Sequence, residues 1–194
     1  MLALPPAPAA TPRRQLLVGT ALVSAAAISL VGGMLGLWLR FRHDAIAVPD
    51  GGWLPQGAEV PEVATNVMLI AFGFICVLAQ WAVYAARRGD SPHTGVAIGL
   101  VALLGIAVIN SQAFVYDRMA LPVRGDTAYN AMFYALTGTF VALVVAGVTF
   151  SAVTAFRYLG GRTMDREIVT AHAIWWYVLT ALYSVIWLAV YVTK

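Results

Sequence analysis

The stretch Thr127–Phe156, TAYNAMFYALTGTFVALVVAGVTFSAVTAF, runs for thirty residues without a Lys, Arg, Asp or Glu. A transmembrane helix needs about 20 mostly apolar residues to cross a hydrocarbon layer roughly 30 Å thick, so this stretch can span a membrane. A helix is the expected form, because lipid offers no hydrogen-bonding partners to the open edges of strands. The alternating segments of about ten residues that form a membrane β-barrel are not visible in the sequence.

Four further stretches have the same character: Gln15–Leu39, Val63–Ala86, Thr94–Tyr116 and Ile168–Thr193. The 194 residues are 61% hydrophobic and only 11% charged, and the mean hydropathy is +0.80. Because soluble domains carry about 25% charged residues, this composition excludes a soluble domain, a disordered chain and a nucleic-acid module. The 12 Lys and Arg and nine Asp and Glu residues all lie outside the five stretches.

We therefore predict an all-α fold, a polytopic membrane bundle of five transmembrane helices that forms one domain over residues 15–194. Short loops make consecutive helices antiparallel neighbours, so an up-and-down bundle is expected. The longest connection, residues 40–62, contains three prolines and several glycines, and we expect an irregular outer loop rather than a sixth helix. The Ala- and Pro-rich residues 1–14 are expected to form a loose cytoplasmic tail.

The Lys and Arg residues near the span ends indicate the orientation of the chain. With the N-terminus inside, the inner side holds Arg13, Arg14, Arg87, Arg88, Arg157, Arg162 and Arg166. The outer side then holds Arg40, Arg42, Arg118, Arg124 and Lys194. This bias, with the acidic first loop, favours N-in and C-out. The string Thr11–Arg14 also resembles a twin-arginine or secretory signal, but the apolar run continues to Leu39, which favours a retained signal-anchor.

Three histidines and one cysteine offer few ligands for a metal or a haem. His43 lies on the predicted outer side, His93 in an inner loop, and His172 one turn inside the last span. No two of the histidines stand at helical spacing from each other, so we expect no cofactor and no metal in this chain. The lone Cys76 also cannot form an internal disulfide.

Features of transporters and of enzymes are equally hard to find. Proton and ion pathways are normally marked by ionisable residues within the membrane, and the five stretches contain none apart from His172. The strongest polar groups within the spans are expected to hydrogen-bond between helices. They are Asn66, Gln80, Asn110, Ser111 and Gln112. No nucleophile is paired with a base in a recognisable motif, so no catalytic residues are expected.

Most of the tryptophans lie toward the span ends, where aromatic residues anchor helices at membrane interfaces. Three of these tryptophans and the tryptophan of the first loop, together with an arginine pair and a histidine at the inner side, are the candidates that we expect to contact lipid or the membrane interface. These candidates are Trp53, Trp81, Arg87, Arg88, Trp175, Trp176 and His172. Two patterns of small residues, Gly32–Gly36 and Gly95–Gly99, would permit close helix approach. The residues alone thus favour a membrane-embedded accessory or packing subunit.

Five strings follow one another in an order and spacing that cover nearly the whole chain. They are GGWLP at Gly51–Pro55, AARRGD at Ala85–Asp90, QAFVY at Gln112–Tyr116, AYNAMFYALTG at Ala128–Gly138, and the aromatic-rich Trp176–Tyr191. In this order they resemble subunit III of haem–copper respiratory oxidases (cytochrome c oxidase), in the five-helix, actinobacterial-like bacterial form.

The chain departs from this family at the ionisable positions within the membrane. Where the family has a pair of histidines on its fourth helix, this chain has Phe140 and Leu143. The last helix of the family carries a W-H-x-x-D-x-x-W pattern, and this chain reads WYVLTALY over Trp176–Tyr183. A glutamate of the family's first helix is replaced by Ala, Ser and Leu around Ile28. The resemblance is therefore to a divergent member.

The resemblance implies a non-redox accessory subunit that packs on catalytic subunit I, beside subunit II, holds phospholipids and stabilises turnover. Haem and copper would lie in the partner subunits, and the complex would carry out electron transport in aerobic respiration. It also implies the inner (plasma) membrane of a bacterium, with a cytochrome bc complex as a further partner in a supercomplex.

Two alternatives remain open from the sequence. The chain could be an accessory subunit or assembly factor of another membrane complex, such as nitric oxide reductase, and genome neighbours would distinguish this case. It could also be a small stand-alone transporter, which uptake by proteoliposomes would reveal. A nucleic-acid partner is not expected, because a net charge of +3 is accounted for by membrane orientation.

Overall fold

The structure, a computed structural model, describes residues 14–49, 51–123, 127–161 and 166–193. These residues form five long helices and no strand. The helices are α1 (Gln15–Ile46), α2 (Glu62–Arg87), α3 (Ser91–Met119), α4 (Ala128–Leu159) and α5 (Arg166–Ile186), and the last continues into a π-helical turn, η1 (Trp187–Val192). Each helix, with η1 counted as part of the fifth, is long and apolar enough to cross a membrane. The predicted all-α bundle with five spans is confirmed.

Part of the sequence that bears on the prediction lies outside the described residues. The expected cytoplasmic tail, residues 1–14, lies outside them except for Arg14. The same holds for several charges used for the orientation: Arg13, Arg124, Arg162 and Lys194.

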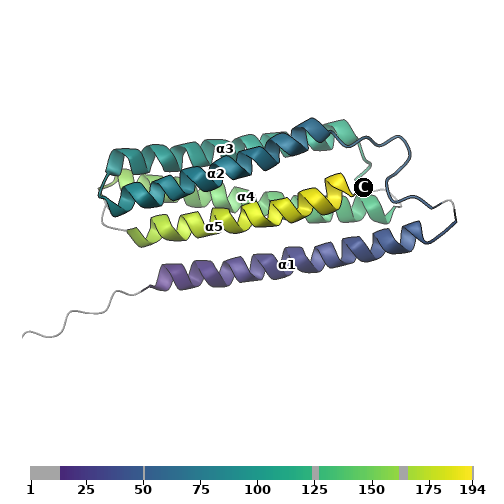
Figure 1. Cartoon of the computed structure of the whole chain (residues 1–194), viewed down its shortest axis with the longest axis horizontal. Helices are drawn as coiled ribbons and strands as arrows, with labels where there is room; N and C mark the ends of the chain where they lie inside the picture. Colours follow the sequence, from purple (N-terminus) through teal and green to yellow (C-terminus); the bar gives the residue numbers. More distant parts are fainter. Residues whose placement is uncertain (1–13, 50, 124–126, 162–165, 194) are drawn as a thin grey trace, which may run out of the picture.

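The last helix lies at the centre of the bundle. It packs against α1, α2 and α4, and it lies between α1 and α2 in Figure 1. Helices α2, α3 and α4 follow the expected order of consecutive neighbours, but α1 packs on α5 and α4 instead of on α2. The long connection after α1 explains the difference, because it lets the chain pass the end of α5 before α2 begins.

The first helix extends beyond its predicted end at Leu39, so residues 40–46 of the expected outer loop are helical. Arg40 Nε donates a hydrogen bond of 2.8 Å to Asp44 Oδ2, one turn along the helix. Pairs of opposite charge at this spacing support a helix outside the apolar run. The described residues of 47–61 are irregular, as their prolines and glycines predict.

Side-chain caps begin the third and fourth helices. Asp90 Oδ1 accepts from the His93 backbone N–H at 3.2 Å, and Thr127 Oγ1 accepts from the Asn130 N–H at 3.4 Å. Gly160 follows the last residue of α4, and Gly161 has a φ of +84°, which only glycine adopts freely. These residues end the helix.

A carboxylate on the last helix caps the first. Glu167, in the first turn of α5, accepts a hydrogen bond of 3.0 Å at Oε1 from the backbone N–H of Leu17. This N–H belongs to the first turn of α1, where four backbone donors have no partner within the helix. A negative charge there also opposes the positive end of the helix dipole. The contact fixes the start of α1 against the start of α5.

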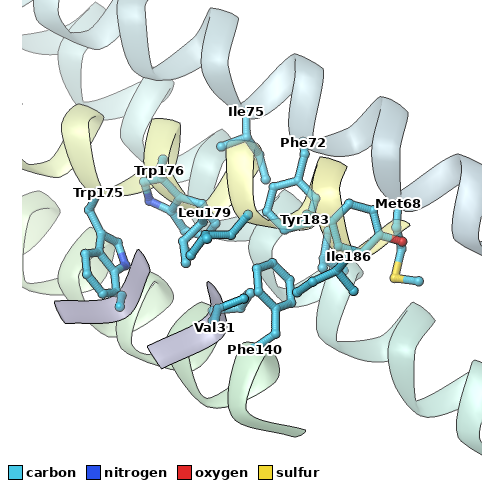
Figure 2. Packing of buried hydrophobic residues seen from close by; sticks show 14 of the residues in the cluster. Val31, Met68, Phe72, Ile75, Phe140, Trp175, Trp176, Leu179, Tyr183 and Ile186 are labelled. Carbon is cyan, nitrogen blue, oxygen red and sulfur yellow. The ribbon is translucent and has the colours of Figure 1, made fainter. Parts of the chain in front are cut away.

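Large apolar and aromatic side chains fill the interior around α5. Figure 2 shows Leu179 and Tyr183 of α5 between Phe72 of α2 and Phe140 of α4. The ring of Tyr183 stacks on that of Phe72 with 4.8 Å between centroids, and lies 5.5 Å from that of Phe140. The ring of Phe140 also lies 5.7 Å from that of Phe72, so the three rings join α2, α4 and α5.

Two single glycines, and not the two predicted glycine patterns, permit the closest packing. A Cβ added at Gly105 of α3 would lie 2.7 Å from Cη2 of Trp176, and one at Gly147 of α4 would lie 3.1 Å from Cζ2 of the same ring. In contrast, a Cβ at either end of the patterns Gly32–Gly36 and Gly95–Gly99 would meet nothing within 4 Å. The prediction that these patterns mediate close approach is therefore wrong within this chain.

Candidate functional site

Three of the seven predicted interface residues lie at the surface, toward the C-terminal end of α2. Arg87 and Arg88 are exposed, and Arg88 Nη1 donates to the hydroxyl of Tyr84 at 2.9 Å. Trp81 is half-buried, with its ring centroid 6.0 Å from that of His93. An aromatic residue beside cations at a span end is the usual composition of a membrane interface.

The other four predicted interface residues are covered by the chain itself. Trp176 and His172 have no exposed area, and Trp175 and Trp53 are only 5% and 6% exposed. Position near a span end does not show which face of a helix a residue occupies, and these residues of α5 lie on its buried face. The side chains of Trp53, Trp176 and His172 contact protein, which corrects the expectation that they face lipid, while Trp175 also lines a cavity between the helices.

His172 of α5 forms a buried polar cluster with Ser151 of α4 and Trp176 of its own helix. Its Nε2 lies 2.7 Å from Ser151 Oγ, and the indole nitrogen of Trp176 lies 3.1 Å from both atoms. Ser151 Oγ also lies 3.0 Å from the Gly147 carbonyl oxygen. We refer to Ser151, His172 and Trp176 as the histidine cluster.

The hydrogen bonds of the histidine cluster favour one tautomer of the imidazole. With the proton on Nε2, His172 donates to Ser151 Oγ, Ser151 donates to the Gly147 carbonyl, and Trp176 donates to Ser151. Only the lone pair of His172 Nδ1 then has no partner. The other tautomer would leave a buried N–H without an acceptor, and such donors are rare in folded proteins. The cluster therefore joins α4 to α5 through neutral groups.

Replacing Ser151 with Ala should destabilise the bundle. Without the hydroxyl, the tautomer with the proton on Nε2 leaves the N–H groups of both His172 and Trp176 without an acceptor, and the other tautomer satisfies only Trp176 and leaves the His172 Nδ1–H unpaired. We expect a loss of about 1–3 kcal/mol in the free energy of unfolding, measured by thermal unfolding in detergent. Thr149→Val is the control, since the Thr149 hydroxyl bonds only to the Val145 carbonyl of its own helix. Equal effects of the two substitutions would show that the cluster does not hold the helices together.

Amide side chains form hydrogen bonds between helices, as predicted for three of the polar residues within the spans. Each accepts from an aromatic residue of the last helix: Asn66 from Trp187 at 2.9 Å, Gln80 from Tyr177 at 2.6 Å and Gln112 from Tyr191 at 3.1 Å. For Asn110 and Ser111, the described residues show no such bond.

Neutral groups also pair between α2 and the last helix. Tyr177 donates to Gln80. Thr180 Oγ1 lies 3.2 Å from the thiol of Cys76. The same hydroxyl lies 2.9 Å from the Trp176 carbonyl oxygen. Hydroxyl, thiol and amide groups thus join α2 to α5 without charge.

Three aromatic side chains hold the first loop against the bundle. The ring of Trp53, in the loop, lies 5.0 Å from that of Trp38 on α1 and 5.3 Å from that of Tyr129 on α4. Trp38 and Tyr129 are themselves 5.2 Å apart, and the Trp38 indole donates to the Ala189 carbonyl at 3.2 Å. We refer to Trp38, Trp53 and Tyr129 as the aromatic box.

An apolar cavity of about 390 Å³ opens between α1, α4 and α5. Gln15, Gly19 and Val23 of α1 form one side, and Phe150 of α4 and Trp175 of α5 form the other. The cavity lies near the end of the bundle where α1 begins. Among the described residues, no group of three or more His, Cys, Asp or Glu side chains could hold a metal ion.

Comparison with known proteins identifies the family. The family model for cytochrome c oxidase subunit III matches residues 42–194. The chain is 30% identical to cytochrome c oxidase subunit 3 of Sus scrofa over 175 residues, which cover 86% of this chain and 64% of that protein. It is also 30% identical to subunit 3 of Danio rerio over 169 residues, covering 82% and 62%. The chain thus spans less than two thirds of the length of these relatives.

The matched residues take in the end of α1, the first loop and all of α2, α3, α4 and α5. They include Trp53 and Tyr129 of the aromatic box, the histidine cluster and the amide pairs between α2 and α5. With five apolar helices and a match over most of its length, the chain belongs to the cytochrome c oxidase subunit III family.

Proposed function

We propose that the chain is a non-redox accessory subunit of a haem–copper respiratory terminal oxidase, which packs on catalytic subunit I in a complex that also contains subunit II. The family match over residues 42–194 carries this proposal. The interior supports it, because it consists of apolar and aromatic side chains and neutral hydrogen-bonded groups, as a scaffold requires. Haem and copper would belong to the partner subunits, and a cytochrome bc complex would be a further partner in a supercomplex.

The proposed location is the inner membrane of a bacterium, with the N-terminus inside. The chain is a multi-pass membrane protein with five helices long and apolar enough to cross a membrane. Of the described arginines, three lie at the end of the bundle where α1 ends, Arg40, Arg42 and Arg118, and five at the end where α1 begins: Arg14, Arg87, Arg88, Arg157 and Arg166. Positive residues favour the cytoplasmic side, which supports this orientation.

The proposed role also includes holding phospholipid. The apolar cavity between α1, α4 and α5 has the composition expected for an acyl chain, and Arg14 lies beside it at the start of α1. An arginine at the mouth of an apolar groove suits a lipid phosphate, because it supplies charge-assisted hydrogen bonds. A bound lipid would fill space that the side chains of α1 leave open.

A tagged copy of the chain purified in mild detergent should bring down a large haem-bearing subunit. Deletion of the chain should leave the haem absorption spectrum of the remaining oxidase unchanged while shortening sustained oxygen consumption, because the scaffold lies outside the redox centres. Absorption spectroscopy and oxygen-electrode traces test the two parts. Isolation of the tagged chain without a haem protein would contradict the proposal, as would co-purification with a complex that reduces nitric oxide and not oxygen.

A further inference from the structure

The surface between α2 and α5 carries polar groups at membrane depth. On α2 it presents Asn66, Gly73 and Gln80, and on the last helix Tyr177, Ser184 and Trp187. We refer to these six residues as the α2–α5 face. The two helices lie side by side along the bundle, and the view in Figure 1 looks onto both of them.

The two amides of the α2–α5 face keep hydrogen-bond donors unused. Asn66 Oδ1 lies 2.9 Å from the indole nitrogen of Trp187. An indole N–H can only donate, so the atom that it meets is the amide oxygen and the NH₂ group is left over. Gln80 also uses its oxygen, which accepts from Tyr177 at 2.6 Å. Both amides are exposed, and neither NH₂ group has a partner among the described residues.

The NH₂ group of Gln80 lies where lipid offers no acceptor, whereas Asn66 is only four residues from the start of α2 at Glu62. Gln80 lies seven residues before the end of α2 at Arg87, which corresponds to about 10 Å along the helix at 1.5 Å per residue. Acyl chains offer no acceptor at that depth, and a polar group without a partner is costly in hydrocarbon. An occupant with oxygen acceptors within the membrane is therefore required.

The spacing of the α2–α5 face suits a helix as that occupant. Asn66, Gly73 and Gln80 are seven residues apart, so they share one side of α2 over about 21 Å. A Cβ at Gly73 would meet nothing within 4 Å, so this glycine leaves open space at the middle of the face. A depression of about 240 Å³ lies at one end, lined by Asn66, Trp187 and Tyr191 among others. Helices in membranes approach closely where such small residues lie between polar ones.

We propose that a transmembrane helix of the catalytic oxidase subunit docks along the α2–α5 face and places hydroxyl or carbonyl acceptors against Gln80 and Asn66. This rests on the proposed function. A second copy of the chain is the competing occupant, and crosslinking within the complex distinguishes it from the catalytic subunit.

Photo-crosslinking within the intact complex tests this docking surface. Gly73 is replaced by benzoylphenylalanine in a tagged chain, and the oxidase is irradiated in native membranes before purification. The expected product is a covalent adduct of this chain with the catalytic subunit, found by mass spectrometry. Leu22 of α1 and Leu103 of α3, which are 67% and 64% exposed, are the control positions. From them we expect adducts with lipid only.

The outcomes separate the docking surface from the proposed function. If the haem subunit co-purifies but position 73 labels only lipid or a second copy of the chain, the proposed docking surface is wrong while the oxidase role stands. If the unmodified tagged chain brings down no haem subunit, the oxidase role itself is wrong. If the haem subunit co-purifies but position 73 does not label it, adducts of Leu22 or Leu103 with the catalytic subunit would show that the interface lies on α1 or α3.

Discussion

Trp38→Ala should lower the free energy of unfolding by about 3–5 kcal/mol, the range for removing a buried tryptophan from a packed interior. Trp38 has no exposed area and contacts both other rings of the aromatic box. Its loss also leaves the Ala189 carbonyl, at the end of the last helix, without the hydrogen bond from the indole. The cavity would lie where α1, α4, η1 and the first loop meet. Thermal unfolding in detergent measures the effect.

The same substitution should release the first loop. Residues 47–61 are held to the helices through Trp53, so loss of its Trp38 contact should expose the loop to protease without unfolding the bundle first. Trp81→Ala is the matched control, because this ring is half-buried at the surface. If both alanine variants unfold at the same temperature and resist protease equally, the aromatic box is not what holds the loop.

The positions of the five spans could be predicted because lipid imposes one strong requirement, a long run without charge. The stretch Thr127–Phe156 meets it, and α4 covers all of it except Thr127, which caps the helix. The extension of α1 to Ile46 escaped prediction, since residues 40–46 are stabilised by Arg40 and Asp44 outside the apolar run. Hydropathy reports where a helix is buried in lipid, and it does not report where the helix ends.

The faces of the helices were less accessible to prediction than their positions. Trp175 and Trp176 lie close to a span end, which is typical of interfacial anchors, yet both belong to the buried side of α5. The i, i+4 spacing of His172 and Trp176 is a signal that they share a face. Nothing in the sequence near them points to Ser151, which the fold brings to them from α4.

The amides were predicted correctly for a physical reason. An amide within a span has few acceptable environments, so hydrogen bonding to another helix was the favoured interpretation for Gln80 and Asn66. The partners could not be predicted, because they depend on α5 lying between α1 and α2. Neutral pairs such as Gln80–Tyr177 join helices without the desolvation that buried charges incur.

Gly105→Leu should have an effect comparable to that of Trp38→Ala, through overpacking instead of a cavity. Even a Cβ at this position would lie 2.7 Å from both Trp176 Cη2 and a methyl group of Val148. Trp176 cannot move aside easily, because it is fully buried and its indole N–H is held in the histidine cluster. Forced repacking of this kind typically costs about 1–3 kcal/mol and sometimes more, and we expect the upper end of that range.

The direction of the stability change separates overpacking at Gly105 from the ordinary gain in helix propensity when glycine is replaced. Gly99→Leu, on the same helix, adds a side chain where a Cβ meets nothing within 4 Å, so it should be neutral or stabilising by up to about 1 kcal/mol. Thermal unfolding of both variants in detergent, with tryptophan fluorescence to follow the environment of Trp176, makes the comparison. If the two leucine variants shift stability in the same direction, the closeness of α3 to Trp176 does not limit packing. If only Gly105→Leu destabilises the bundle, the centre of this fold lies where α3 and α4 meet the tryptophan of the last helix.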